Sequence, residues 1–202
     1  MKRYLLYAFI WITFASYGQL SFGVKGGGNF GTVVFSTREF AVVSEQYRLD
    51  VVFRGYAGLY SELPITENLF ARAEASYLLT GGKQSSPGRR PSTYNFGYLF
   101  APLSIGYKLN SIVTLFTGFH SSILISENNY DNGLPKEYMN KIDFGLQLGI
   151  ESMIKDNFGI GIQYSHGLRD MQRTTEPFVF DFQLHNRGVQ LYLKFGINLK
   201  KK

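Results

Sequence analysis

Eight ionisable residues alternate with bulky aliphatic residues along the chain, and they are its strongest candidates for a chemical role. Four are basic and four are acidic: Lys25, Arg54, Glu62, Arg72, Glu74, Asp143, Glu151 and Lys194. Neighbouring residues of a β-strand point to opposite faces, so the alternation puts the charges on one face and the aliphatic side chains on the other. Equal numbers of opposite charges on one face predict mutual ion pairing rather than a charged channel lining.

The histidines and hydroxyl residues form no known catalytic or metal-binding motif. The three histidines are His120, His166 and His185, and none has local metal spacing such as His-x-x-x-His. We expect His120 to be a hydrogen-bonded lining residue and His185 to be a solvated loop residue. Lipid-modifying barrel enzymes combine Ser, His and acidic residues at one rim, where this chain has Ser121, Ser122, Ser126 and Glu127, but nothing marks an activated nucleophile. We predict no catalytic residue, metal or cofactor.

Eight amphipathic segments carry the alternation, and each is long enough to cross a bilayer as a tilted strand. One parity of the last segment, for example, is wholly apolar: Val189, Leu191, Leu193, Phe195, Ile197 and Leu199. We predict strands near residues 20–31, 51–63, 69–80, 96–108, 112–125, 142–154, 158–170 and 187–199. The 22 glycines and the 16% of aromatic residues, nearly all Phe and Tyr, also favour β over α structure.

The connections between these segments alternate strictly in length. The short ones are 64–68, 110–111 and 155–157, and the long ones are 32–50, 81–95, 126–141 and 171–186. This alternation is typical of an up-and-down barrel with tight turns at one end and long loops at the other. A Greek-key sandwich has no reason to alternate in this way. With an even strand number, both termini are expected at the short-turn end.

The first 18 residues have the three parts of a secretory signal peptide. Lys2 and Arg3 precede an apolar run over residues 5–15, which is followed by Ser16-Tyr17-Gly18. The run is too short for a membrane anchor, which needs roughly 20 apolar residues. We predict cleavage after Gly18, so that 1–18 is the signal peptide and 19–202 is one barrel domain. The chain has no cysteine, which excludes lipoprotein acylation and disulfides.

Together these features predict an all-β fold, an eight-stranded antiparallel up-and-down transmembrane β-barrel. We expect it in the outer membrane, with periplasmic termini and extracellular long loops. Lys or Arg facing lipid at mid-membrane costs about 2–4 kcal/mol, so the charges belong inside, and eight strands leave an interior that side chains can fill. A soluble lipocalin-like barrel is the alternative. It fits less well because the polar parity is rich in Gly, Ser and Thr and residues 19–202 lack tryptophan.

The turn at 155–157 predicts which residues face each other. With three turn residues and Ile154 opposite Phe158, Asp143 lies across from Arg169, which adds Arg169 to the predicted luminal charges. The same register gives two further pairs, Gln147 with Ser165 and Glu151 with Gly161. Three of the charges fall close to the 64–68 turn: Glu62, Arg72 and Glu74. Pro102 lacks a ladder N–H and predicts a bulge or local irregularity in its strand.

The net charge does not indicate nucleic acid as a partner. It is +6, and removing Lys2 and Arg3 leaves +4 on residues 19–202, scattered without a basic stripe. The long connection 81–95 is basic and suits anionic lipopolysaccharide at the outer leaflet. We expect outer-membrane lipid and lipopolysaccharide as partners, together with envelope or secretion-system proteins. The sequence leaves the oligomeric state open.

Six segments, in order along the chain, resemble the PorT-like outer-membrane β-barrel family. They lie at residues 22–30, 58–64 with 73–77, 98–103, 164–170 and 186–191, and they include the Tyr98-Leu99-Phe100-Ala101-Pro102-Leu103 motif. The resemblance implies an integral eight-stranded outer-membrane barrel, and for some relatives a role in type IX secretion or maturation of surface proteins. Many outer-membrane barrels end in an aromatic residue, whereas this chain continues to Lys200-Lys201-Lys202. We expect a non-enzymatic barrel that docks envelope partners; a small porin and a lipid-modifying enzyme are the alternatives.

Overall fold

The computed structural model describes residues 20–37, 49–84, 92–129, 140–155, 157–171 and 182–198. The strands are β1 Ser21–Thr37, β2 Leu49–Asp50, β3 Val52–Pro64, β4 Leu69–Gln84, β5 Ser92–Lys108, β6 Val113–Asn129, β7 Ile142–Lys155, β8 Phe158–Gly167 and β9 Phe182–Asn198. Across these ranges, no helix has both the length and the apolar character needed to span a membrane. The predicted signal peptide and the terminal lysines lie outside them.

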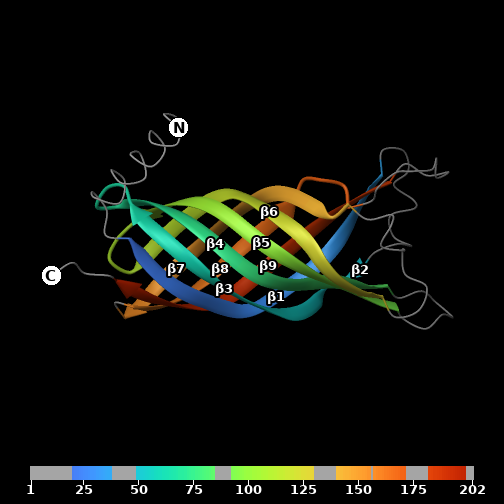
Figure 1. Ribbon diagram of the computed structural model, residues 1–202, viewed down its shortest axis with the longest axis horizontal. Coiled ribbons are helices and arrows are strands. Elements are labelled where there is room, and N and C mark those ends of the chain that lie inside the picture. Colours follow the sequence, from blue (N-terminus) through green and yellow to red (C-terminus); the bar gives the residue numbers. More distant parts are fainter. Residues whose placement is uncertain are drawn as a thin grey trace, which may run out of the picture.

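The strands form one antiparallel sheet that closes on itself. Apart from the two-residue β2, strands adjacent in sequence pair with each other, and β1 pairs with β9 to complete the barrel (Figure 1). The two-residue β2 continues the path of β3, because both pair with β4 in registers that differ by one residue. The predicted eight-stranded up-and-down barrel is therefore confirmed. Ser21 faces Asn198, so the first and last strands meet at the end of the barrel that carries the short turns.

The strand centres lie where the alternation predicted them, but most strands extend further at the long-loop end. β1 continues to Thr37 rather than residue 31, β6 continues to Asn129 rather than 125, and β9 begins at Phe182 rather than 187. Backbone pairing of β1 with β9 persists to Thr37 and Phe182. In these extensions the parity that is apolar in the strand centres carries mostly polar residues, so the ladder continues where the sequence signal stops. β7 begins at Ile142 as predicted, and β8 ends early, at Gly167.

Two of the short turns are held by local hydrogen bonds. In the first, the Ile65 N–H donates to the Leu69 carbonyl at 2.8 Å. In the second, the Asn110 Oδ1 accepts the N–H groups of Ile112 and Val113, both at 2.8 Å. Asn commonly stabilises a turn in this way because its short side chain reaches the backbone two or three residues ahead.

The third short turn is tighter than predicted. Lys155 pairs with Phe158, and the register shifts between Met153 and Lys155, so Ile154 forms a bulge instead of facing Phe158. The rest of the predicted hairpin register is confirmed: Gln147 pairs with Ser165 and Glu151 with Gly161.

Pro102 interrupts a ladder without forming a bulge. The β4–β5 pairs Ala73 with Leu103 and Ser76 with Phe100 share one register, and the positions between them carry no pairing in the described residues. The missing N–H of proline therefore faces β4, while Pro102 still pairs with His120 on β6. The predicted irregularity is present as this gap. The register shift of β5 lies elsewhere, between Gly97 and Tyr98.

The alternation sorts the side chains between the interior and the exterior of the barrel. Outward-facing Leu59, Leu103 and Phe119 are 63%, 65% and 71% exposed, whereas inward-facing Arg72 and Glu151 are each 2% exposed. The largest fully buried side chains are Tyr98, Phe100, Gln147, Gln163 and Gln190. An exposed apolar exterior around an interior that buries charged residues is the reverse of a soluble barrel.

Candidate functional site: an ionic cluster in the barrel interior

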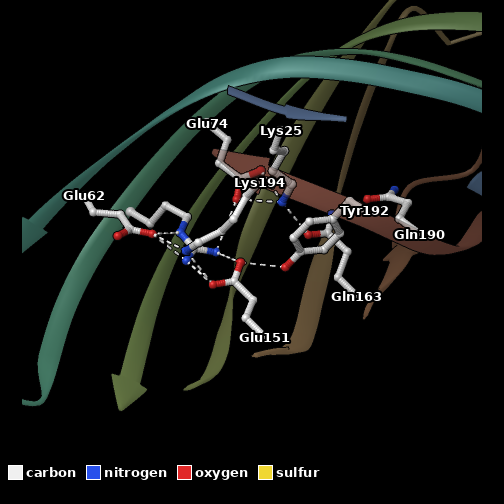
Figure 2. Close-up of polar contacts among 9 residues, drawn as sticks. Lys25, Glu62, Glu74, Glu151, Gln163, Gln190, Tyr192 and Lys194 are labelled. Atoms are coloured by element: carbon white, nitrogen blue, oxygen red, sulfur yellow. Dashed lines mark hydrogen bonds and ion pairs between the residues drawn. The ribbon is translucent and has the colours of Figure 1, made fainter. Parts of the chain in front are cut away.

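Six ionised side chains meet inside the barrel near its short-turn end, and we name them the ionic cluster. They are Lys25 of β1, Glu62 of β3, Arg72 and Glu74 of β4, Glu151 of β7 and Lys194 of β9. Figure 2 labels Lys25, Glu62, Glu74, Glu151 and Lys194 and shows these five directed toward one another. Three are cations and three are carboxylates, so the cluster is neutral. All but Glu62 have side chains exposed by 6% or less.

Arg72 joins opposite parts of the wall. Its Nη1 and Nη2 donate to the two carboxylate oxygens of Glu151, both at 2.6 Å. Its Nε and Nη2 donate to Glu62 Oε1 at 2.8 and 2.6 Å. Because β5 and β6 separate β4 from β7 in the sheet, the bond between Arg72 and Glu151 spans the lumen. The planar guanidinium suits this role, since it binds one carboxylate with two parallel N–H groups and still has a donor for another.

The two lysines supply the remaining positive charges that balance the three carboxylates. Lys194 Nζ donates to Glu151 Oε2 at 2.8 Å and to Glu62 Oε1 at 3.1 Å. Lys25 Nζ lies 2.8 Å from Glu74 Oε2. Each carboxylate of the cluster therefore has at least one cation within ion-pair distance, which is the condition under which buried charges are tolerated.

Neutral side chains complete the cluster. Tyr192 Oη donates to Glu151 Oε1 at 2.6 Å, and Lys25 Nζ donates to Gln163 Oε1 at 2.8 Å. Gln163 in turn donates to Gln190 (Figure 2). Lys25 Nζ also lies 4.1 Å from the centre of the Tyr192 ring, a cation–π distance. Tyr192 and Gln163 were not predicted as members of the luminal charge network, and their inward parity was the only signal for them in the sequence.

The other predicted luminal charges lie outside the ionic cluster. Arg54 is on the inward parity but half-buried, and its Nε donates to Asn95 Oδ1 at 2.9 Å. Asp143 is buried near the long-loop end, where it accepts a hydrogen bond from Asn186 Nδ2 at 3.3 Å. The predicted side-chain pair of Asp143 with Arg169 does not form. Because β8 ends at Gly167, the Arg169 side chain is exposed at the rim and donates to the Ile142 carbonyl at 3.2 Å.

The long-loop half of the interior is filled mainly by apolar and aromatic side chains. Its buried members include Phe96, Tyr98, Phe100, Leu124, Met171 and Leu184. His120 lies inward as predicted, 6% exposed, with its ring centre 4.9 Å from that of Phe100. Its Nδ1 has no hydrogen-bond partner among the described residues. In the part of the chain that the structure describes, no three His, Asp or Glu residues are grouped to hold a metal ion.

The short-turn end opens into a vestibule of about 900 Å³. Its rim carries Lys108, Asn110 and Lys155, and its inner lining includes Glu62 and Lys194 of the ionic cluster. The cluster thus forms the floor of a polar mouth.

Comparison with known proteins gives a family match and structural neighbours. The model of the family described as "Outer membrane protein beta-barrel domain" matches residues 14–173. The crystal structure of Neisserial surface protein A is similar at 12% identity, with 86% of this chain and 96% of that chain covered and a TM-score of 0.53. The Pseudomonas aeruginosa outer membrane protein OprG is similar at 9% identity, with coverages of 90% and 97% and a TM-score of 0.52. These likenesses concern the fold. A comparison with curated proteins finds no match.

Proposed function

The chain belongs to the outer membrane protein beta-barrel domain family, and from this premise we propose that it is a non-enzymatic barrel with a closed interior that docks other envelope proteins at its ends. The observation that carries the proposal is the ionic cluster. Its Arg72–Glu151 bond spans the lumen, and opening that path requires separating buried, mutually compensated charges. A protein whose lumen is closed acts through its rims and loops.

The long-loop half adds a second closure of different chemistry. Tyr98 and Phe100 are each 2% exposed, and Met171 is 4% exposed. A solute crossing the barrel would have to displace these packed side chains as well as the ion pairs. The two closures together favour docking over diffusion as the function.

The docking partners follow from the proposed orientation. We place the short-turn vestibule in the periplasm and the long loops outside, as alternation of loop length predicts for outer-membrane barrels. The periplasmic mouth, with Lys108 and Lys155 at its rim, then faces periplasmic or secretion-apparatus proteins. The long loops face lipopolysaccharide. The six PorT-like segments support secretion or maturation of surface proteins as the process, and one of them, on β5, points Tyr98, Phe100 and Pro102 into the barrel.

Planar-bilayer recording tests whether the lumen is closed. The reconstituted protein, shown to be folded by a heat-dependent gel shift, is expected to give no stable single-channel steps. A large, stable conductance would refute the closed interior. A small porin is the alternative function, and the observation that favours it is the polar vestibule of about 900 Å³.

Site-specific photo-crosslinking in intact cells tests docking. A photoreactive residue replacing Ser111, which is exposed at the short-turn end, is expected to capture envelope proteins. The control carries the same residue in place of Phe119, which points outward from the middle of β6 and is 71% exposed. Equal capture at Ser111 and Phe119 would contradict the docking proposal. Failure to capture any protein, both at Ser111 and with the same photoreactive residue placed in the long loops, would also contradict it.

A further inference from the structure

A small cavity lies in the long-loop half of the interior, apart from the ionic cluster. It measures about 20 Å³, which is enough for roughly one water-sized occupant. Its polar lining includes Asn29 of β1, Asp143 of β7 and Asn186 of β9. Asn29 is 1% exposed and Asp143 is 5% exposed, so both are withdrawn from solvent. Burial of polar groups is costly unless each finds a partner.

Three oxygen atoms of this lining have no hydrogen-bond partner among the described residues: Asn29 Oδ1, Asp143 Oδ1 and Asn186 Oδ1. The amide orientations are fixed by the donors on the other side. Asn29 Nδ2 donates to the Leu79 carbonyl at 2.9 Å. Asn186 Nδ2 donates to Tyr98 Oη at 3.2 Å and to Asp143 Oδ2 at 3.3 Å. Each of these side chains therefore keeps one oxygen without a donor, and a donor or a cation would complete the set.

The carboxylate of Asp143 also takes part in none of the salt bridges found among the described residues. Two basic side chains of the long-loop half bond other groups: Arg54 Nε donates to Asn95 Oδ1 at 2.9 Å, and Arg187 Nε donates to His166 Nδ1 at 3.1 Å. His185 also acts on Asp143 electrostatically. The ionic cluster is neutral within itself, so it supplies no surplus charge to balance Asp143.

We propose that this cavity binds one small monovalent cation of about the size of sodium, coordinated by Asp143 Oδ1 and the amide oxygens of Asn29 and Asn186. Hard alkali and alkaline-earth cations prefer such oxygen ligands. The site has one carboxylate and therefore favours a monovalent cation. A monovalent cation leaves the buried site neutral, whereas a divalent cation leaves it positive. Small residues preserve the space: a Cβ added at Gly188 would lie 2.7 Å from Asn29 Oδ1, and one at Gly167 would lie 2.4 Å from Asp143 Oδ2.

The test compares cations at equal ionic strength, so that screening of exposed charges is constant. The folded full chain in micelles is unfolded with urea in sodium chloride or in N-methylglucamine chloride, whose cation is too large for the cavity. Sodium at about ten times its dissociation constant is expected to raise the folding equilibrium constant roughly tenfold. Asp143→Asn is expected to abolish this difference. The matched control, Glu67→Gln, removes a carboxylate from the exposed 65–68 turn and is expected to retain it.

A direct measurement of sodium binding tests the proposal even if Asp143→Asn folds poorly. The sodium NMR line is expected to broaden with the wild-type protein and to lose that broadening with Gly188→Ala, whose added methyl group fills the site. Equal stability in both salts together with an unbroadened line would overturn the proposal and leave water or a proton as the occupant. A sodium effect that survives in both variants would also overturn it, because the ion would then bind elsewhere.

Discussion

Replacing Arg72 with methionine removes the charge that joins opposite parts of the wall while keeping a long side chain. The guanidinium donates four hydrogen bonds to Glu62 and Glu151, at 2.6 to 2.8 Å. Arg72→Met therefore leaves three carboxylates facing two lysines in a largely buried site. Lys194 and Tyr192 still contact Glu151, so the loss is partly compensated.

The expected cost follows from these contacts. Removing one partner of a buried ion pair costs about 3–5 kcal/mol, because the remaining charge stays buried without compensation. The contacts that remain with Glu151 place Arg72→Met toward the lower value, about 3 kcal/mol. With a urea m value of about 2 kcal/mol per molar, the unfolding midpoint should fall by about 1.5 M. Circular dichroism in micelles measures it, and the heat-dependent gel shift provides a second readout.

Arg54→Met is the matched control, because Arg54 has the same side chain and the same inward parity. Its guanidinium bonds a neutral amide, Asn95 Oδ1, and the Phe53 carbonyl, and it is only half-buried. Its loss should cost less than about 1.5 kcal/mol. The double variant Arg72→Met/Glu151→Met should cost less than the sum of its single changes, because it removes both charges together. Equal midpoints for Arg72→Met and Arg54→Met would refute the reasoning.

Three further predictions probe the wall and a turn by the same unfolding measurement. Phe119→Arg puts a cation on the lipid side of β6 and should cost about 2–4 kcal/mol, whereas Phe119→Leu should cost much less; equal costs would mean that this face does not meet lipid. Gly27→Ala sets a Cβ 1.9 Å from a β9 carbonyl oxygen and should cost about 1–3 kcal/mol, while Gly55→Ala, whose nearest atom is 3.8 Å away, should be nearly neutral. Asn110→Ala removes the acceptor of two turn N–H groups and should cost about 1 kcal/mol, against no measurable change for Ser111→Ala.

The sequence predicted the sides of the wall and most of the strand pairing because both depend on local pattern. A period of two sorts each strand into two faces, and a short turn fixes the register of its hairpin. The pairing of Glu151 with Gly161 follows from those two facts and was found. Glu62 and Arg72 likewise face each other across the first short turn. The long-loop ends were missed because pairing continues there after the outward parity stops being apolar.

Contacts across the lumen are not contained in any local pattern. Arg72 meets Glu151 because barrel closure brings β4 opposite β7, and neither residue type nor spacing encodes that distance. Tyr192 and Gln163 were missed for the same reason. Arg169 was misplaced through an end effect: its register position does lie opposite Asp143, and its backbone N–H bonds that carboxylate. The strand ends two residues earlier, however, and the long side chain turns to the rim.

The ionic cluster also bears on why the barrel adopts one register. Well-packed apolar residues in place of buried ion pairs are often equally or more stable, so stability alone does not account for charges here. A one-residue slip of β4 would turn Arg72 and Glu74 outward to lipid, and the arginine alone would cost about 2–4 kcal/mol at mid-membrane. The same slip would leave Glu151 facing Lys194 without Arg72. Inward charges therefore penalise slipped registers more than an apolar interior would, and the residues of the ionic cluster help to specify which face of each strand lies inside.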